Sequence, residues 1–155
     1  MNSMSEPIRQ TEDGAARAPT PGVRGPIMLG VEGGRLTPGD RTRLGDARVG
    51  GVILFRRNIE DAVQTYKLVK ELRATVPTPM FHCIDLEGGT VDRLRDMIAP
   101  APSAEKVFAT GRKSIYREHG RLLGEECSAL GFNTDFAPVS DLGFEIGRAS
   151  CRERV

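Results

Sequence analysis

The sequence predicts an α/β fold of about four βα units, and two patterns support this prediction. Short apolar segments bounded by glycine or proline recur along the chain, as is typical of buried strands. The segments between them carry apolar residues at helical spacing. This alternation indicates a parallel sheet whose strands are joined by helical crossovers.

The first two strands are expected at 27–31 and 49–55, because both segments are apolar and bounded by glycine. A helix should follow, with Asn58 as its N-cap and Asp61 in its first turn, near the positive end of the helix dipole. Apolar residues then repeat at helical spacing up to about Ala74. These residues are Ile59, Ala62, Val63, Tyr66, Val69 and Leu72.

The third strand is expected at 80–84, after a pair of prolines that ends the preceding helix. Side chains alternate along a strand, so each face of this one carries every second residue. Phe81, Cys83 and Asp85 should therefore share one face. His82 and Ile84 should share the other, where His82 is expected to be a packed or rim residue.

Two helices and a fourth strand complete the predicted elements. A short helix should begin at Ser103 and stop at Gly111, and a longer helix should run over about 113–130. Gly131 stands where a left-handed residue commonly ends a helix. The fourth strand is expected at 133–139.

The segment from Ile84 to Arg95 is the strongest candidate for a functional site. An apolar strand stops there at Asp85, and a Gly-Gly pair and two arginines follow. Polar groups at the carboxyl ends of buried strands are where α/β proteins bind ligands. An ionised Asp85 can accept hydrogen bonds from two adjacent sugar hydroxyls, and Arg93 offers a fork of donors.

A purely structural interpretation of the same residues stays open. Asp85 caps the turn after its strand in that interpretation, and Glu87 is a solvated ion-pair partner of a nearby arginine. Asp92 and Arg95 are expected at the surface or in support of the site. Asp141, just past the fourth strand, is expected to cap the next turn rather than contact substrate.

Composition excludes several other classes of function. The net charge of +1 gives no reason to expect a nucleic acid or an anionic membrane as partner. No apolar run approaches the length needed to span a bilayer, and no secretory signal is recognisable. The three cysteines are widely spaced, which argues against a disulfide framework and favours the cytoplasm. Neither histidine has a partner at metal-ligand spacing, so no metal site is expected.

The two ends of the chain do not fit the βα pattern. Residues 1–24 are rich in Pro, Thr, Ser, Ala and charge, so we expect a disordered arm. Residues 146–155 match one reading frame of a common short-read sequencing adapter. We therefore expect the genuine sequence to end near Glu145, and we assign no substrate contact to Arg148.

Four ordered motifs resemble the amino-terminal barrel domain of family-three glycoside hydrolases. They are G-P-I-M-L-G-V-E-G at 25–33, V-G-G-V-I-L-F-R-R-N at 49–58, D-L-E-G-G-T-V-D-R-L at 85–94 and L-G-F-N-T-D-F-A-P-V-S-D-L at 130–142. The match is best to the bacterial β-N-acetylglucosaminidase (β-N-acetylhexosaminidase) branch, which acts in cell-wall recycling. The resemblance covers residues 25–145.

This resemblance implies the fold, the activity and the site residues. The fold would be the amino-terminal half of a (β/α)8 TIM barrel, since a complete barrel needs roughly 250 residues and the chain has 155. The enzyme would be a retaining exo-glycosidase that needs no cofactor and removes terminal N-acetylglucosamine. By position in the family motif, Asp85 and Arg93 bind the sugar. Leu86 and Thr90 stand where the family usually has glutamine and often arginine.

The family's bond-breaking residues have no counterpart in this chain. Its Lys-His-Phe-Pro-Gly motif, its His-Asp acid/base and its aspartate nucleophile lie downstream of the position of Glu145. A retaining glycosidase needs both a nucleophile and an acid/base. We therefore expect this chain to be catalytically inactive and, with one apolar face of its sheet uncovered, poorly stable.

Two other functions remain open at this stage. A β-glucosidase of the same superfamily would also use Asp85 to bind a sugar hydroxyl. A doubly wound nucleotide-binding or regulatory domain belongs to a different class. The second is disfavoured because the glycines at 30–34 do not fit G-x-G-x-x-G and no phosphate-binding G-x-x-x-x-G-K-[ST] motif is present.

Overall fold

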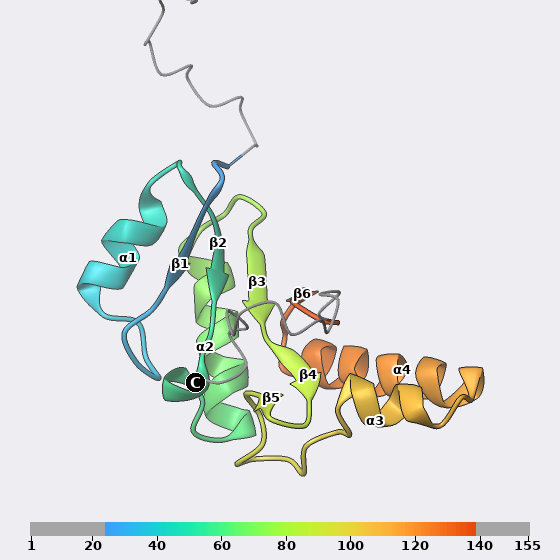
Figure 1. The fold of residues 1–155 in the computed structure, drawn as a ribbon. Helices are drawn as coiled ribbons and strands as arrows, with labels where there is room; N and C mark the ends of the chain where they lie inside the picture. Colours follow the sequence, from blue (N-terminus) through green and yellow to red (C-terminus); the bar gives the residue numbers. More distant parts are fainter. Residues whose placement is uncertain (1–23, 139–155) are drawn as a thin grey trace, which may run out of the picture.

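Four parallel strands form the sheet of this protein, whose computed structural model describes residues 24–138 (Figure 1). They are β1 (Ile27–Gly30), β2 (Val49–Ile53), β3 (Phe81–Ile84) and β6 (Thr134–Asp135). Their order in the sheet, β1-β2-β3-β6, is also their order along the chain. Each strand is thus added beside the previous one after a crossover, as in the first half of a (β/α)8 barrel. The predicted fold class is confirmed.

The strands are shorter than predicted, but each lies inside its predicted segment. The chain leaves the sheet after Gly30 and Ile53, although apolar residues continue to Val31 and Phe55. The apolar side chains just past these strand ends are nevertheless buried. Val31 and Leu54 are only 2% and 1% exposed, so the loops pack them into the core. The predicted terminal segments 1–24 and 146–155, and Asp141 and Arg148, lie wholly or almost wholly outside the described residues.

Helix α2 (Ala62–Thr75) follows β2, but its N-cap is Asp61 and the prediction of Asn58 was wrong. The Asp61 carboxylate accepts a hydrogen bond from the Gln64 amide at 2.8 Å. Asn58 instead ends a 3-10 turn, η1 (Arg56–Asn58), and is completely buried. Its amide group donates to the carbonyls of Val31 and Gly33 at 3.1 and 3.0 Å. An amide side chain can either cap a helix or bond to buried carbonyls. Because Asn58 ends the turn η1, its side chain takes the second role.

Helix α1 (Pro38–Gly45) was not predicted. Its amino end is a capping box, in which Thr37 Oγ1 accepts from the Asp40 amide at 3.1 Å and Asp40 accepts from the Thr37 amide at 3.0 Å. Pro38 at the first helical position adds to this signal. Only Leu44 and Asp40 of this helix are buried, so the apolar periodicity that identifies longer helices is missing.

The remaining helices agree with the sequence. Helix α3 (Ala104–Ala109) begins after Ser103, whose hydroxyl caps it, and α4 (Lys113–Ala129) ends just before Gly131. Gly131 has φ +88°. The Phe132 amide bonds to the Cys127 carbonyl at 3.0 Å and the Gly131 amide to the Ser128 carbonyl at 3.0 Å. This is the Schellman arrangement, and it requires the left-handed residue that glycine supplies.

A two-stranded antiparallel hairpin, which was not predicted, lies between β3 and α3. It consists of β4 (Leu86–Gly88) and β5 (Val91–Asp92), with Leu86 paired to Asp92. Along the chain, residue 85 alone separates β3 of the parallel sheet from β4 of the hairpin. The segment from Ile84 to Arg95, which the sequence singled out as the candidate site, therefore contains this hairpin.

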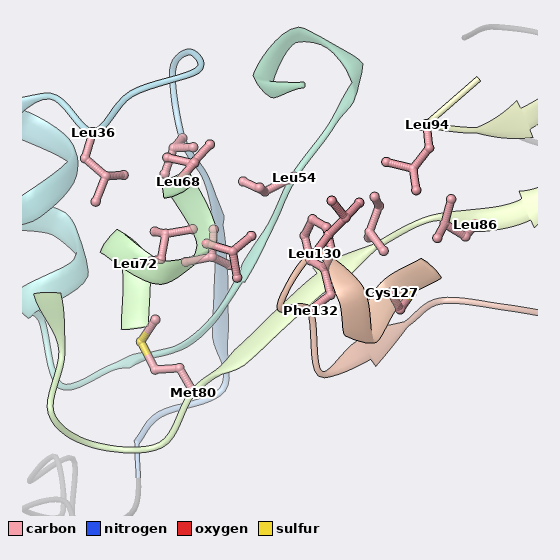
Figure 2. Packing of buried hydrophobic residues seen from close by; sticks show 14 of the residues in the cluster. Leu36, Leu54, Leu68, Leu72, Met80, Leu86, Leu94, Cys127, Leu130 and Phe132 are labelled. Carbon is pink, nitrogen blue, oxygen red and sulfur yellow. The ribbon is translucent and has the colours of Figure 1, made fainter. Parts of the chain in front are cut away.

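The hydrophobic core lies between the sheet and helices α2 and α4. Figure 2 shows side chains from α2 and from the end of α4 meeting the strands. The completely or almost completely buried members include Val52, Leu54, Leu68, Val69, Leu72, Ile84, Leu86 and Leu94. His82 is also buried, at 5% exposure, which confirms that it is a packed residue.

The opposite face of the sheet carries exposed apolar side chains. Met28 and Phe81 lie on this face, because both are in register with Gly51, and they are 37% and 60% exposed. Phe136, just after β6, is 44% exposed. In a complete barrel this face points to the interior. The described residues therefore leave the interior side of the sheet open.

Candidate functional site

Asp85 and Arg93 form an ion pair at the carboxyl end of β3. Arg93 Nη2 lies 2.8 Å from Asp85 Oδ2, and Arg93 Nε donates to the same oxygen at 3.3 Å. The side chains are 12% and 19% exposed for Arg93 and Asp85. The structure therefore brings together the two residues predicted for the site. Among the described residues, Asp85 Oδ1 receives no hydrogen bond, which leaves an acceptor for a ligand hydroxyl.

Phe55 lies under this ion pair, and sequence reasoning gave it no role. The guanidinium carbon of Arg93 is 5.8 Å from the centre of the Phe55 ring, and that of Arg57 is 4.9 Å from it. Both distances are typical of cation–π contacts. Phe55 and Arg57 follow β2, whereas Asp85 follows β3, so two adjacent strand ends build one cluster. Their position directly after a strand is the one feature of the sequence that could have placed Phe55 and Arg57 in the site.

The end of β1 also meets this cluster. A side-chain carbon added to Gly30 would lie 3.1 Å from Arg57 Nη2 and 3.7 Å from the Phe55 ring. The carboxyl ends of three consecutive strands therefore converge around Asp85, Arg93, Phe55 and Arg57. This is the edge at which parallel α/β folds bind their ligands.

The Gly88-Gly89 pair closes the hairpin against the chain's own backbone. Both glycines have positive φ, +74° and +62°. A side-chain carbon at Gly88 would lie 2.4 Å from the Pro102 carbonyl oxygen, and one at Gly89 2.7 Å from Ser103 Cβ. The Gly89 amide donates to the Ala101 carbonyl at 2.8 Å. The glycines are thus needed for packing against the loop before α3.

Two further carboxylates support the backbone next to the ion pair. Asp92 is 4% exposed, contrary to a surface position, and accepts from the Leu94 amide at 2.9 Å. Asp135 accepts from the Leu86 amide at 2.9 Å. Burial raises the pKa of Asp135 to about 6, and the neighbouring charges of Asp85, Glu87 and Asp92 act in the same direction. Arg95, by contrast, is exposed and bonds to the Thr90 carbonyl.

The part of the chain that the structure describes holds no group of three His, Cys, Asp or Glu side chains that could bind a metal ion. His82 Nε2 is buried and has no hydrogen-bond partner among residues 24–138, and burial lowers the pKa of this imidazole. His119 Nε2 lies 2.7 Å from the Pro102 carbonyl. Among the helices of residues 24–138, none is long and apolar enough to cross a membrane.

An open apolar hollow of about 700 Å³ lies elsewhere, between α2 and α4. Its apolar lining includes Val63, Tyr66, Ile98 and Leu122. None of the residues around the ion pair lines it. It lies on the helix-covered side of the sheet, whereas ligands of parallel α/β folds bind at the strand ends. We therefore place the candidate site at Asp85 and Arg93.

Comparison with known proteins gives a clear family match. The chain matches the family model described as "Glycosyl hydrolase family 3 N terminal domain" over residues 28–154. A beta-hexosaminidase of Thiobacillus denitrificans is 40% identical over 126 residues, covering 77% of this chain and 35% of that protein. One from Alkalilimnicola ehrlichii is 36% identical over 130 residues and is covered to 37%. The chain thus spans about a third of the length of these relatives.

Solved structures show the same likeness. A NagZ from Neisseria gonorrhoeae in complex with N-trifluoroacetyl-D-glucosamine superposes with a TM-score of 0.68 at 34% identity. That match covers 77% of this chain and 36% of the other. A glycoside hydrolase family 3 beta-N-acetylglucosaminidase from Paenibacillus sp. str. FPU-7 has a TM-score of 0.68 at 34% identity, with 72% and 22% covered.

Proposed function

The chain belongs to glycosyl hydrolase family 3, whose N-terminal domain it matches, and from this premise we propose that it supplies the sugar-binding part of a β-N-acetylglucosaminidase. One observation carries the proposal. Asp85 and Arg93, the residues at the family's sugar-binding positions, form a partly exposed pair where β3 ends. The whole enzyme would be a retaining exo-glycosidase that releases terminal N-acetylglucosamine, as in the recycling of cell-wall fragments.

Within this function the two residues have different tasks. The Asp85 carboxylate accepts hydrogen bonds from two adjacent hydroxyls of the terminal sugar through Oδ1 and the remaining capacity of Oδ2. Arg93 orients that carboxylate and offers a donor to a ring substituent. Phe55 keeps the guanidinium in place from below. None of these groups attacks or protonates the glycosidic bond.

Bond cleavage requires residues that this chain does not contain. A retaining mechanism uses a carboxylate nucleophile and a separate acid/base on either side of the scissile bond. The motifs that carry these groups in the family have no counterpart among the 155 residues. We therefore propose that the chain binds the sugar without hydrolysing its glycosides. The two cysteines in the described part of the chain, Cys83 and Cys127, are buried free thiols, which fits a reducing compartment such as the cytoplasm.

Sugar binding by the 155-residue chain tests the proposal. N-acetylglucosamine added during an NMR titration should shift the amide signals of residues 84–95. Asp85→Asn and Arg93→Ala should weaken this binding by at least about tenfold, because a hydrogen bond to a charged group contributes roughly 1.5–3 kcal/mol. Arg95→Ala is the matched control, since Arg95 lies on the same segment but outside the ion pair.

Three results would count against the proposal. Binding that responds equally to Arg93→Ala and Arg95→Ala would exclude the ion pair as the sugar site. Glucose bound as tightly as N-acetylglucosamine would favour a β-glucosidase. Release of nitrophenol from a nitrophenyl N-acetylglucosaminide well above a buffer blank would show that the chain contains a nucleophile after all.

A further inference from the structure

We propose that Asp135 is a positioning residue for the sugar-binding pair, acting through the backbone on both sides of Asp85. This inference rests on the proposed function, because it concerns the same pair. Asp135 is the last residue of β6, and it lies far from residue 85 in the sequence. In space β6 lies directly beside β3 (Figure 1).

Both neighbours of Asp85 in the chain are hydrogen-bonded to the end of β6 or to the residue after it. On one side, the Phe136 amide donates to the Ile84 carbonyl at 2.9 Å. On the other side, the Leu86 amide donates to the Asp135 carboxylate at 2.9 Å. The two residues that flank Asp85 are therefore bonded to two consecutive residues, Asp135 at the end of β6 and Phe136 directly after it. The main chain of residue 85 has little freedom to rotate, and the direction of its side chain is set.

The side chain of Asp135 acts where the main-chain pairing of β3 with β6 ends. The last paired residues are Ile84 and Asp135, and from Leu86 onward the chain pairs with β5 instead. Leu86 is fully buried, so its amide has no access to water and needs an acceptor in the protein. The Asp135 carboxylate accepts from this amide across the junction between the parallel sheet and the hairpin.

The same bond also determines the position of Arg93. Leu86 is paired with Asp92 in the hairpin. Asp85 precedes Leu86 and Arg93 follows Asp92, so the ion pair flanks this pair of residues. Fixing Leu86 therefore places both members of the ion pair. The second carboxylate of the hairpin, Asp92, holds the Leu94 amide on the far side of Arg93.

Keeping a carboxylate at residue 135 is electrostatically unfavourable. It is partly buried and faces the negative charges of Asp85, Glu87 and Asp92, and its charge also acts on the buried Cys127 thiol of α4. In exchange, an ionised carboxylate accepts an amide hydrogen bond more strongly than a neutral group. Charge and hydrogen bond are therefore separable: asparagine removes the charge but keeps an acceptor, and alanine removes both.

Hydrogen exchange measured by NMR on the 155-residue chain at pH 7 distinguishes these roles. In Asp135→Ala, exchange at the Leu86 amide and at Arg93 Nε should speed up by about tenfold or more, while amides of α2 such as Leu72 change little. Affinity for N-acetylglucosamine should fall about tenfold. Asp135→Asn should restore all three readouts to within about threefold of the parent chain. Glu126→Gln, which removes a carboxylate that interacts with Asp92 and Cys127 but does not bond to Leu86, should behave like the parent chain.

The possible results distinguish the role of Asp135 from the proposed sugar binding. If Asp135→Asn fails to restore what Asp135→Ala loses, or if α2 amides lose protection equally, Asp135 does not position the pair. Unchanged exchange at Leu86 and Arg93 in Asp135→Ala would overturn the inference as well. If the parent chain does not bind N-acetylglucosamine while the exchange results hold, the proposed function fails and the link from Asp135 to the ion pair stands.

Discussion

At the scale of single residues, the ion pair between Asp85 and Arg93 matters for geometry more than for stability. Both side chains are only partly exposed, so separating them would leave a charge with reduced access to water. Both hydrogen bonds from Arg93 end on Oδ2 of Asp85, so within residues 24–138 Oδ1 is left available to a ligand. Arg93 also rests on Phe55, which limits the positions of its guanidinium group. The arrangement suits a residue pair that holds a ligand in one orientation.

His82 makes stability depend on pH. Burial lowers the pKa of its imidazole in the folded protein, and the charge of Arg73 adds to this effect. As the pH falls below 6.5, the unfolded chain takes up a proton that folded His82 resists, so the free energy of unfolding decreases. Asp135 acts in the opposite sense, because its raised pKa lets the folded protein bind a proton first.

The pH dependence of unfolding should therefore change in His82→Gln. We expect the fall in the free energy of unfolding between pH 6.5 and 5 to be smaller in this variant than in the parent chain, measured by urea titration at each pH. Asp135→Asn supplies the comparison, since it should make the same fall steeper. An identical pH profile in parent and His82→Gln would show that the buried imidazole does not titrate as inferred.

At the scale of elements, the hairpin of β4 and β5 depends on contact with the loop before α3. Gly88, the last residue of β4, and Gly89, which follows it, bring the backbone against Pro102 and Ser103, at distances that no side chain tolerates. Helix α4 contributes through His119, whose ring contacts the Pro102 carbonyl at 2.7 Å. The hairpin, the loop and the helix thus position the segment that carries Arg93.

Gly88→Ala should destabilise the protein, whereas Gly124→Ala should not. At Gly88 the positive φ and the 2.4 Å approach to the Pro102 carbonyl oxygen both oppose a side chain. The cost should be about 2–4 kcal/mol, combining roughly 1–2 kcal/mol of backbone strain with the displacement of the loop. At Gly124, inside α4, nothing lies within 4 Å of an added carbon.

The matched Gly124→Ala variant should be unchanged or more stable by up to about 1 kcal/mol, because alanine favours helix. Both values come from chemical unfolding followed by circular dichroism. Equal effects of the two substitutions would mean that the hairpin does not pack on the loop as described.

At the scale of the whole molecule, the two faces of the sheet differ. Helices α2 and α4 cover one face and form the core with it (Figure 2). Met28, Phe81 and Phe136 are partly exposed on the other face or near it. A sheet in a barrel buries both faces, so this half of the barrel leaves apolar side chains in contact with water.

Substitutions on the two faces should therefore have different costs. Phe81→Thr, on the open face, should change the free energy of unfolding by less than about 1 kcal/mol and should reduce the binding of a hydrophobic dye. Leu72→Ala, in the core at 1% exposure, should cost about 2–5 kcal/mol. If Phe81→Thr is as costly as Leu72→Ala in urea unfolding, the face is covered in solution.

Local patterns in the chain were sufficient to predict most of the elements. Apolar runs gave the four strands, and helical spacing gave α2 and α4, because buried elements need apolar residues at the period of their geometry. Helix α1 was missed because it is short and mostly exposed, so only its capping residues indicate it. The hairpin was missed because its strands have three and two residues, too few for a period to appear.

The sequence by itself determined the fold class and pointed to Asp85 and Arg93, because strand ends and motif spacing are local properties of the chain. Tertiary structure alone decided what surrounds the pair. Phe55 lies beneath Arg93 and Asp135 holds Leu86 only because the crossovers place β2 and β6 on either side of β3. Such contacts join residues tens of positions apart, and no pattern along the chain records the distance between them.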